Sequence, residues 1–145
     1  MKNINASTVA KELINISYRE EGTDITNLKL QKLLYYVQGT SISMLGEKMF
    51  PEKIIKWQYG PVVKNIYHEY KEYSNQIIPI QDQKINIPKK YLDVINMVYD
   101  FFGQYSAVKL MHMTHSEPPW NTVEIGEEIT GEIMKPFFDS IITED

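Results

Sequence analysis

The chain has 145 residues, of which 43% are hydrophobic and 23% charged, and it contains no cysteine. This size and composition predict one globular domain rather than a disordered chain. A chain without cysteine has no disulfides, thiol nucleophiles or thiolate zinc sites, which fits a cytoplasmic protein. No apolar run approaches the roughly 20 residues that cross a bilayer, and the N-terminus lacks a signal-peptide core. We therefore expect neither secretion nor membrane insertion.

The net charge of −4 is unevenly distributed along the chain. Residues 1–72 carry a net charge of +2, whereas residues 73–145 carry −6. An acidic half disfavours non-specific nucleic-acid binding, which depends on lysine and arginine contacts to phosphates. It is compatible with a basic protein partner, and equally with a solvated surface that aids solubility.

Apolar spacing predicts a mainly α fold, a single compact domain of about five to seven helices with a small two-stranded β element. The helices are expected at about 7–21, 28–45, 61–73, 91–102, 106–115 and 130–142, with a short helical turn at 120–123. Four helices begin at residues that can accept a hydrogen bond from the first turn. These expected N-caps are Asn5 or Ser7, Thr26 or Asn27, Ser106, and Thr130.

The second helix, 28–45, has an apolar arc too broad for a surface helix, so we expect it to be central and mostly buried. Gly39 lies inside it and costs about 1 kcal/mol relative to alanine. A glycine at this position indicates close approach by another backbone element. In the last helix, Pro136 lies too deep for a first turn, which predicts a kink or a later start.

A β-prone run, 54–59, ends at Gly60 and Pro61. Pro61 suits the first turn of the third helix, where a missing amide proton has no cost. The polar segment 74–90 is expected to be a loop with one or two short strands that pair with residues 54–57.

Three histidines are the first candidates for an enzyme site. His112 and His115 can share one face of a helix with Glu117 nearby, but a metal needs a third or fourth ligand, and His68 is on another helix. The alternative is that they are hydrogen-bonded histidines at a helix end. No glycine-rich phosphate loop or Gly-x-Ser-x-Gly elbow is present. We expect no catalysis and no cofactor, with a metal-dependent enzyme as the minor alternative.

Lysines interleave with aromatic residues in the first half of the chain, a pattern that can bind single-stranded nucleic acid. The alternative places the aromatic residues in the core and the lysines on a solvated rim, and we favour it. The residues concerned are Lys29, Lys32, Lys48, Lys53, Lys56 and Lys64, with Tyr35, Tyr36, Trp57 and Tyr59.

Three segments together resemble the Panacea domain of SocA-like antitoxins, a family that includes phage-associated GepA-like proteins. Residues 28–39 read LKLQKLLYYVQG, residues 57–63 read WQYGPVV, and residues 114–120 read THSEPPW. Their order and spacing are similar to those of the family, and the resemblance runs from about residue 4 to 138. The motif residues, as scaffold or binding positions, are Leu30, Gln31, Lys32, Tyr35, Tyr36, Gln38, Gly39, Trp57, Tyr59, Gly60, Pro61, Val62, Tyr67, His115, Ser116, Glu117 and Trp120.

The resemblance implies a single helical domain over 1–145, bacterial or phage-encoded, that acts in the cytoplasm. It implies an antitoxin that neutralises a cognate toxin by direct protein–protein binding. The alternatives it brings are an adaptor that delivers the toxin to a protease, and a phage counter-defence protein. Many members carry an extra DNA-binding segment, for which we expect no room in this chain.

Physical reasoning favours a scaffold role for most of the motif. Gln31 and Lys32 are expected on the polar side of their helix, and Trp57 is expected to anchor the core against that helix. Since a motif shared across different partners serves the fold, partner choice is expected on other surfaces, namely 74–90 or the acidic 124–145.

Overall fold

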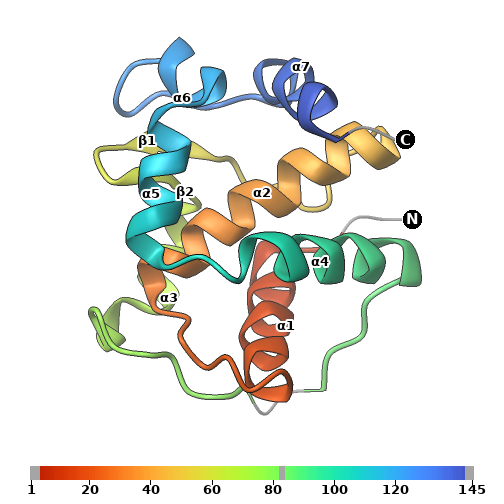
Figure 1. Ribbon diagram of the computed structural model, residues 1–145, viewed down its shortest axis with the longest axis vertical. Helices are drawn as coiled ribbons and strands as arrows, with labels where there is room; N and C mark the ends of the chain where they lie inside the picture. Colours follow the sequence, from red (N-terminus) through yellow and green to blue (C-terminus); the bar gives the residue numbers. More distant parts are fainter. Residues whose placement is uncertain (1–3, 82–83, 143–145) are drawn as a thin grey trace.

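The computed structural model describes residues 4–81 and 84–142, and these confirm a mainly α fold with one small sheet. The described part of the chain forms seven α-helices, one 3-10 helix and one antiparallel strand pair (Figure 1). In chain order they are α1 (Ala6–Arg19), α2 (Asn27–Leu45), β1 (Ile55–Trp57), β2 (Gly60–Val62), α3 (Lys64–Glu69), η1 (Lys71–Tyr73), α4 (Lys89–Phe102), α5 (Ala107–His115), α6 (Pro118–Thr122) and α7 (Gly131–Ile141).

Helix α2 is the centre of the fold, as its broad apolar arc predicts. It runs diagonally through the molecule, with α1 and α4 beside it and α7 across its C-terminal end (Figure 1). Every residue from Lys29 to Ile42 is buried. A Cβ at Gly39 would overlap the ring of Phe138, so the close approach comes from an α7 side chain rather than from a backbone.

Four helices begin at N-caps that the sequence predicts. Asn5, Thr26, Ser106 and Thr130 each accept a hydrogen bond from the amide three residues ahead. These short polar side chains satisfy amides that have no acceptor within the helix. Helix α7 starts at Gly131, so Pro136 lies inside it, and the expected later start is wrong.

Strands β1 and β2 form a hairpin that the sequence analysis places incorrectly. Lys56 pairs with Pro61 in antiparallel register, so Pro61 lies in a strand and the third helix starts later than expected. Its missing amide proton is tolerated because a strand of a two-stranded sheet has an unpaired edge. The expected partner segment contains no strand within its described residues, 74–81 and 84–90.

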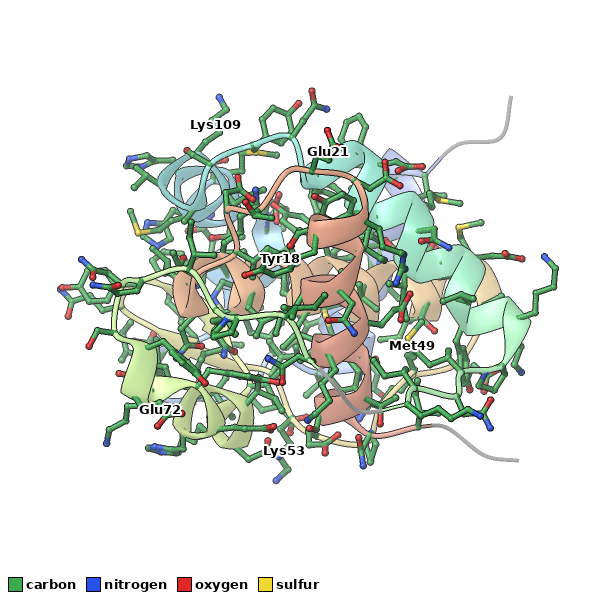
Figure 2. The ribbon with its side chains drawn as sticks, turned by 90° about the horizontal axis from the view of Figure 1, so that it is seen from below. Tyr18, Glu21, Met49, Lys53, Glu72 and Lys109 are labelled. Carbon is green, nitrogen blue, oxygen red and sulfur yellow. The ribbon has the colours of Figure 1, made fainter. Side chains whose placement is uncertain are left out.

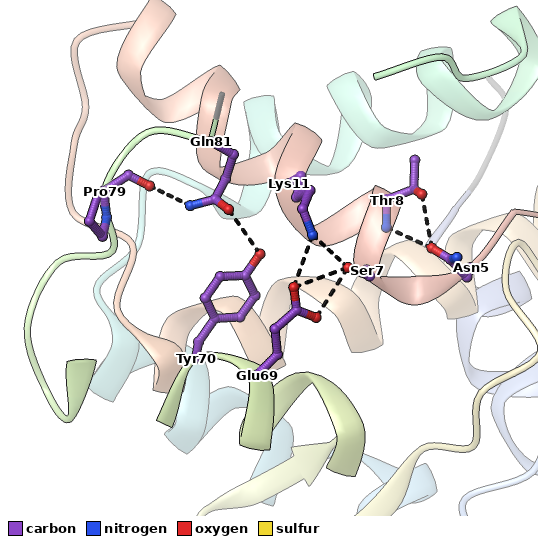
Figure 3. A network of polar contacts seen from close by, with 8 residues as sticks. All are labelled: Asn5, Ser7, Thr8, Lys11, Glu69, Tyr70, Pro79 and Gln81. Atoms are coloured by element: carbon purple, nitrogen blue, oxygen red, sulfur yellow. Dashed lines mark hydrogen bonds and ion pairs between the residues drawn. The ribbon is translucent and has the colours of Figure 1, made fainter. Parts of the chain in front are cut away.

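Helix α1 is tied to α3 and to the segment that follows it. The Nζ of Lys11 lies 2.9 Å from Oε2 of Glu69, and Ser7 donates to the same carboxylate (Figure 3). Tyr18 of α1 lies near the middle of the view from below, and its hydroxyl donates to the carbonyl of Ile78 at 2.8 Å (Figure 2). The start of the 74–90 segment is therefore held against α1.

Candidate binding surfaces

The polar motif residues of α2 are buried, which corrects the expectation that they face solvent. Gln31 and Lys32 are each only 2% exposed. The side-chain oxygen of Gln31 accepts from the amide of Val63 at 2.8 Å, and Nζ of Lys32 donates to the carbonyl of Pro61 at 3.3 Å. Burial lowers the pKa of Lys32 to about 7. Both side chains hold the hairpin to α2. Lys29 and Lys56 are also buried rather than on a solvated rim.

Gln38, about two helical turns beyond Gln31, bonds to the turn that follows α2. Its side-chain nitrogen donates to the carbonyl of Phe50 at 2.7 Å, and its oxygen accepts from the amide of Met49 at 2.8 Å. These bonds satisfy the backbone of the buried turn after α2, where unpaired groups are costly. Gln38 therefore bonds to the backbone within the domain.

Glu117 joins the third motif segment to the first through a buried hydrogen-bond pair. The hydroxyls of Tyr35 and Tyr36 donate to its two carboxylate oxygens at 2.9 and 2.7 Å. Burial raises the pKa of Glu117 to about 7, and the two tyrosine hydrogen bonds oppose that shift. Burial and the charge of Glu117 raise the pKa of both tyrosines, so they stay protonated donors. This network fixes the start of α6 on α2.

His115 belongs to a stack of rings. Its ring lies 4.1 Å from that of Trp120, over which Nζ of Lys56 sits at 3.8 Å from the ring centroid. Burial, followed by the charge of Lys32, lowers the pKa of His115. His115 Nε2 and Trp120 Nε1 are buried with no hydrogen-bond partner among the described residues. Within 4–81 and 84–142 no group of three or more histidine, aspartate or glutamate residues could hold a metal.

Seven motif residues line a surface groove, which we call the hairpin groove: Gln31, Lys32, Trp57, Tyr59, Gly60, Val62 and Tyr67. It lies between the start of α2, the β1–β2 hairpin and α3–η1, with a volume of about 580 Å³. Trp57 is only half-buried and packs edge-on against Tyr67 with ring centroids 5.1 Å apart, so its expected role as a core anchor is wrong. Tyr59 is 63% exposed at the groove. The sequence analysis does not assign Lys71, which also lines it.

A second surface, the α4/α7 face, is apolar and contains no motif residue except Glu117 at its floor. A groove of about 500 Å³ opens there between α4, α5 and α7. On its margins Met97 is 42%, Phe101 56% and Ile141 45% exposed. Sequence reasoning missed this surface. Its signal was the pair of apolar residues four apart, Met97 and Phe101, on the outer side of α4.

Acidic residues flank the α4/α7 face. Asp93 and Asp100 share a neighbouring hollow with Met97 and Phe101. Asp139 of α7 does not line the groove; it pairs with Lys135 and accepts a hydrogen bond from Ser43 of α2. The exposed apolar side chains are thus bordered by carboxylates, in the half of the chain that carries a net charge of −6.

Comparison with known protein families decides where the chain belongs. The model of the antitoxin SocA-like Panacea domain matches residues 30–121, which is more than half of the chain. The chain belongs to the SocA-like Panacea family. No curated protein and no solved structure gives a significant match to it. Among the helices that the structure describes, none is long and apolar enough to cross a membrane.

Proposed function

We propose that this Panacea protein is a non-catalytic antitoxin that binds its cognate toxin directly through the α4/α7 face. Three exposed apolar side chains around one groove carry the proposal: Met97, Phe101 and Ile141. Clustered apolar exposure of this kind is typical of protein interaction sites, whereas single exposed apolar residues are ordinary. A phenylalanine beside a groove is also the kind of residue that anchors an interface.

The charges around this face favour a basic partner. Asp93 and Asp100 share a hollow with Met97 and Phe101, so lysines or arginines that flank an apolar segment of the toxin would meet carboxylates. Such complementarity increases the association rate and disfavours acidic partners. The face also overlaps the acidic 124–145 segment that the sequence suggests as a determinant of partner choice.

The domain extends beyond the matched residues on both sides, and this part is also proposed. The core includes Val9 and Leu13 of α1 and Phe138 of α7, which lie outside 30–121. Since these residues pack with α2 in one cluster, we infer that 1–145 is one Panacea domain. We place it in the cytoplasm of a bacterial cell, where a toxin would act.

Co-expression with the protein encoded by the adjacent gene tests this proposal. We expect growth rescue and a stoichiometric complex. Phe101→Glu should reduce co-purification by about tenfold or more, because a charge would enter an apolar contact. Ile80→Glu is the matched control, since Ile80 is 55% exposed in the alternative segment 74–90. It should leave the complex intact.

The outcomes separate the competing hypotheses. Loss of binding with Ile80→Glu, but not with Phe101→Glu, would move the interface to the 74–90 segment. Rescue without a complex, accompanied by protease-dependent loss of the toxin, would support the adaptor function instead. A neighbouring protein that is harmless on its own would contradict the antitoxin proposal and favour phage counter-defence.

A further inference from the structure

The hairpin groove is lined by basic side chains in a protein whose net charge is negative. Lys32 and Lys71 line it, whereas no aspartate or glutamate does so among the described residues. The chain as a whole carries a net charge of −4. A concave site with low-dielectric walls and one sign of charge concentrates ligands of the opposite sign. The groove is therefore suited to an anion.

Lys32 is the basic group at the base of this groove, and its hydrogen-bonding capacity is underused. An ammonium has three donors. Nζ of Lys32 has one acceptor among the described residues, the carbonyl of Pro61 at 3.3 Å, and no carboxylate pairs with it. Gly60, at φ +116°, lies against the lysine stem, where a Cβ would approach Cε to 2.5 Å. A buried ammonium without a counter-charge is costly, and an anionic ligand would compensate for it.

The start of α2 adds fixed donors to the same groove. Thr26 caps the amide of Lys29, which leaves the amides of Asn27 and Leu28 in the first turn without an acceptor inside the helix. Both residues line the groove. Backbone amides and the helix dipole at the start of a long helix favour phosphate groups.

Aromatic side chains form another part of the wall. Trp57 and Tyr67 pack edge to face, and Tyr59 projects beside them with 63% of its surface exposed. Exposed aromatic faces stack planar rings such as nucleobases. At about 580 Å³ the groove is within the size range of small-molecule sites, which is roughly 300–1,000 Å³.

We propose that the hairpin groove binds a nucleotide, with its phosphates at Lys32 and the start of α2 and its base against Tyr59 and Trp57. This goes beyond the antitoxin function, because the site lies at the other end of α2 from the α4/α7 face. The α2 residues that line the hairpin groove lie in its first two turns, whereas Thr40 lines the other groove. The motif residues would then serve a ligand as well as the fold.

Isothermal titration calorimetry of the full chain tests the proposal with five probes: ADP, GDP, adenosine, guanosine and inorganic pyrophosphate. We expect a nucleoside diphosphate to bind more tightly than both its nucleoside and pyrophosphate. Lys32→Met should weaken that binding by about tenfold or more, as expected for a lost charge-assisted hydrogen bond. Lys53→Met, at an exposed lysine that does not line the groove, should have no effect.

A second variant separates the base from the phosphates and guards against misfolding. Tyr59→Ala should weaken nucleoside diphosphate binding by about fivefold or more while leaving pyrophosphate binding unchanged. Equal affinity for pyrophosphate and nucleotides would overturn the nucleotide assignment. No binding at millimolar concentration, or unchanged binding by Lys32→Met, would overturn the site. Toxin rescue is scored separately with Phe101→Glu, so failure here leaves the antitoxin proposal standing.

Discussion

The hairpin groove and the α4/α7 face lie near opposite ends of one buried helix, and they are built from different kinds of residue. Motif residues, two lysines and aromatic rings line the hairpin groove. Exposed aliphatic and aromatic residues with carboxylates around them form the α4/α7 face. The hairpin groove is suited to a small anionic ligand, and the α4/α7 face is suited to a protein partner.

The difference also bears on the expectation that the motif serves the fold rather than partner choice. Gln31, Gln38 and Glu117 bond to groups inside the domain, so changes on the surface of α4 leave them undisturbed. Partner choice can then vary on α4 and α7 without altering the network around α2. Substitutions should accordingly affect one end of the molecule without the other, except where they break α2 itself.

The largest effect is expected at Gly39, which both ends require. Gly39→Ala places a methyl group where the ring of Phe138 lies, so α7 must shift away from α2. We expect a loss of about 3 kcal/mol in the free energy of unfolding, at the upper end for overpacking. Urea denaturation measures it. Gly46→Ala is the control, because nothing lies within 4 Å of its Cβ position and only its left-handed φ of +74° opposes the change.

That control should cost about 1 kcal/mol, the usual penalty for alanine at a left-handed helix end. Equal losses for the two variants would show that α7 moves freely. In that case the α4/α7 groove would not be a fixed docking surface.

Sequence reasoning succeeded where the signal was local. The N-caps Asn5, Thr26, Ser106 and Thr130 act on amides three residues away, so their identity and position suffice to predict them. The broad apolar arc of α2 likewise predicts its burial. The motif segments supplied the family, which composition alone does not indicate.

It failed where a polar side chain finds its partner far along the chain. Gln31 bonds to Val63 and Lys32 bonds to Pro61, both about 30 positions further along the chain. Hydrophobic periodicity alone assigns such polar residues to the solvent-facing side of a helix. The turn at Gly60 and Pro61 read as a helix start because the strand that pairs with it is only three residues long. Phe101 escaped notice because Phe102 beside it fitted the buried face of α4.

A smaller effect is expected at Lys32, with the opposite sign. Lys32→Met should raise the free energy of unfolding by about 2 kcal/mol near neutral pH, because a buried unpaired ammonium is removed. The shift in the pKa of Lys32 would by itself correspond to a larger gain in stability. Part of that gain is lost because the carbonyl of Pro61 loses its hydrogen-bond donor.

The pH dependence identifies the cause. The folded pKa of Lys32 is about 7 and its ordinary value is 10.5, so the unfolded chain binds more protons between these values. Wild-type stability should therefore rise through this range relative to Lys32→Met. A variant less stable than wild type at neutral pH would show that Lys32 is needed for the fold, which would weaken the contrast between the two grooves.

The smallest effect is expected at Glu117, where the sign of the pH dependence is reversed. Its folded pKa is about 7 against an ordinary 4.5, so the folded state holds the proton longer. The stability it contributes is fully present below about pH 4.5 and is lost as the pH rises through about 7. Glu117→Gln, which cannot ionise, should reduce this loss by about 1–2 kcal/mol. Urea denaturation from about pH 5 to 8 compares the two proteins.

The difference between wild type and Glu117→Gln matters more than either curve. Glu47 and Asp139 have lowered pKa values because they accept hydrogen bonds from lysines, and they stabilise the fold as the pH rises from acid. These contributions cancel in the difference, which isolates Glu117. If the difference in the free energy of unfolding does not change with pH, Glu117 is already ionised and open to water through the α4/α7 groove. A lysine or arginine of the toxin could then reach it there, and toxin binding should fall with Glu117→Gln.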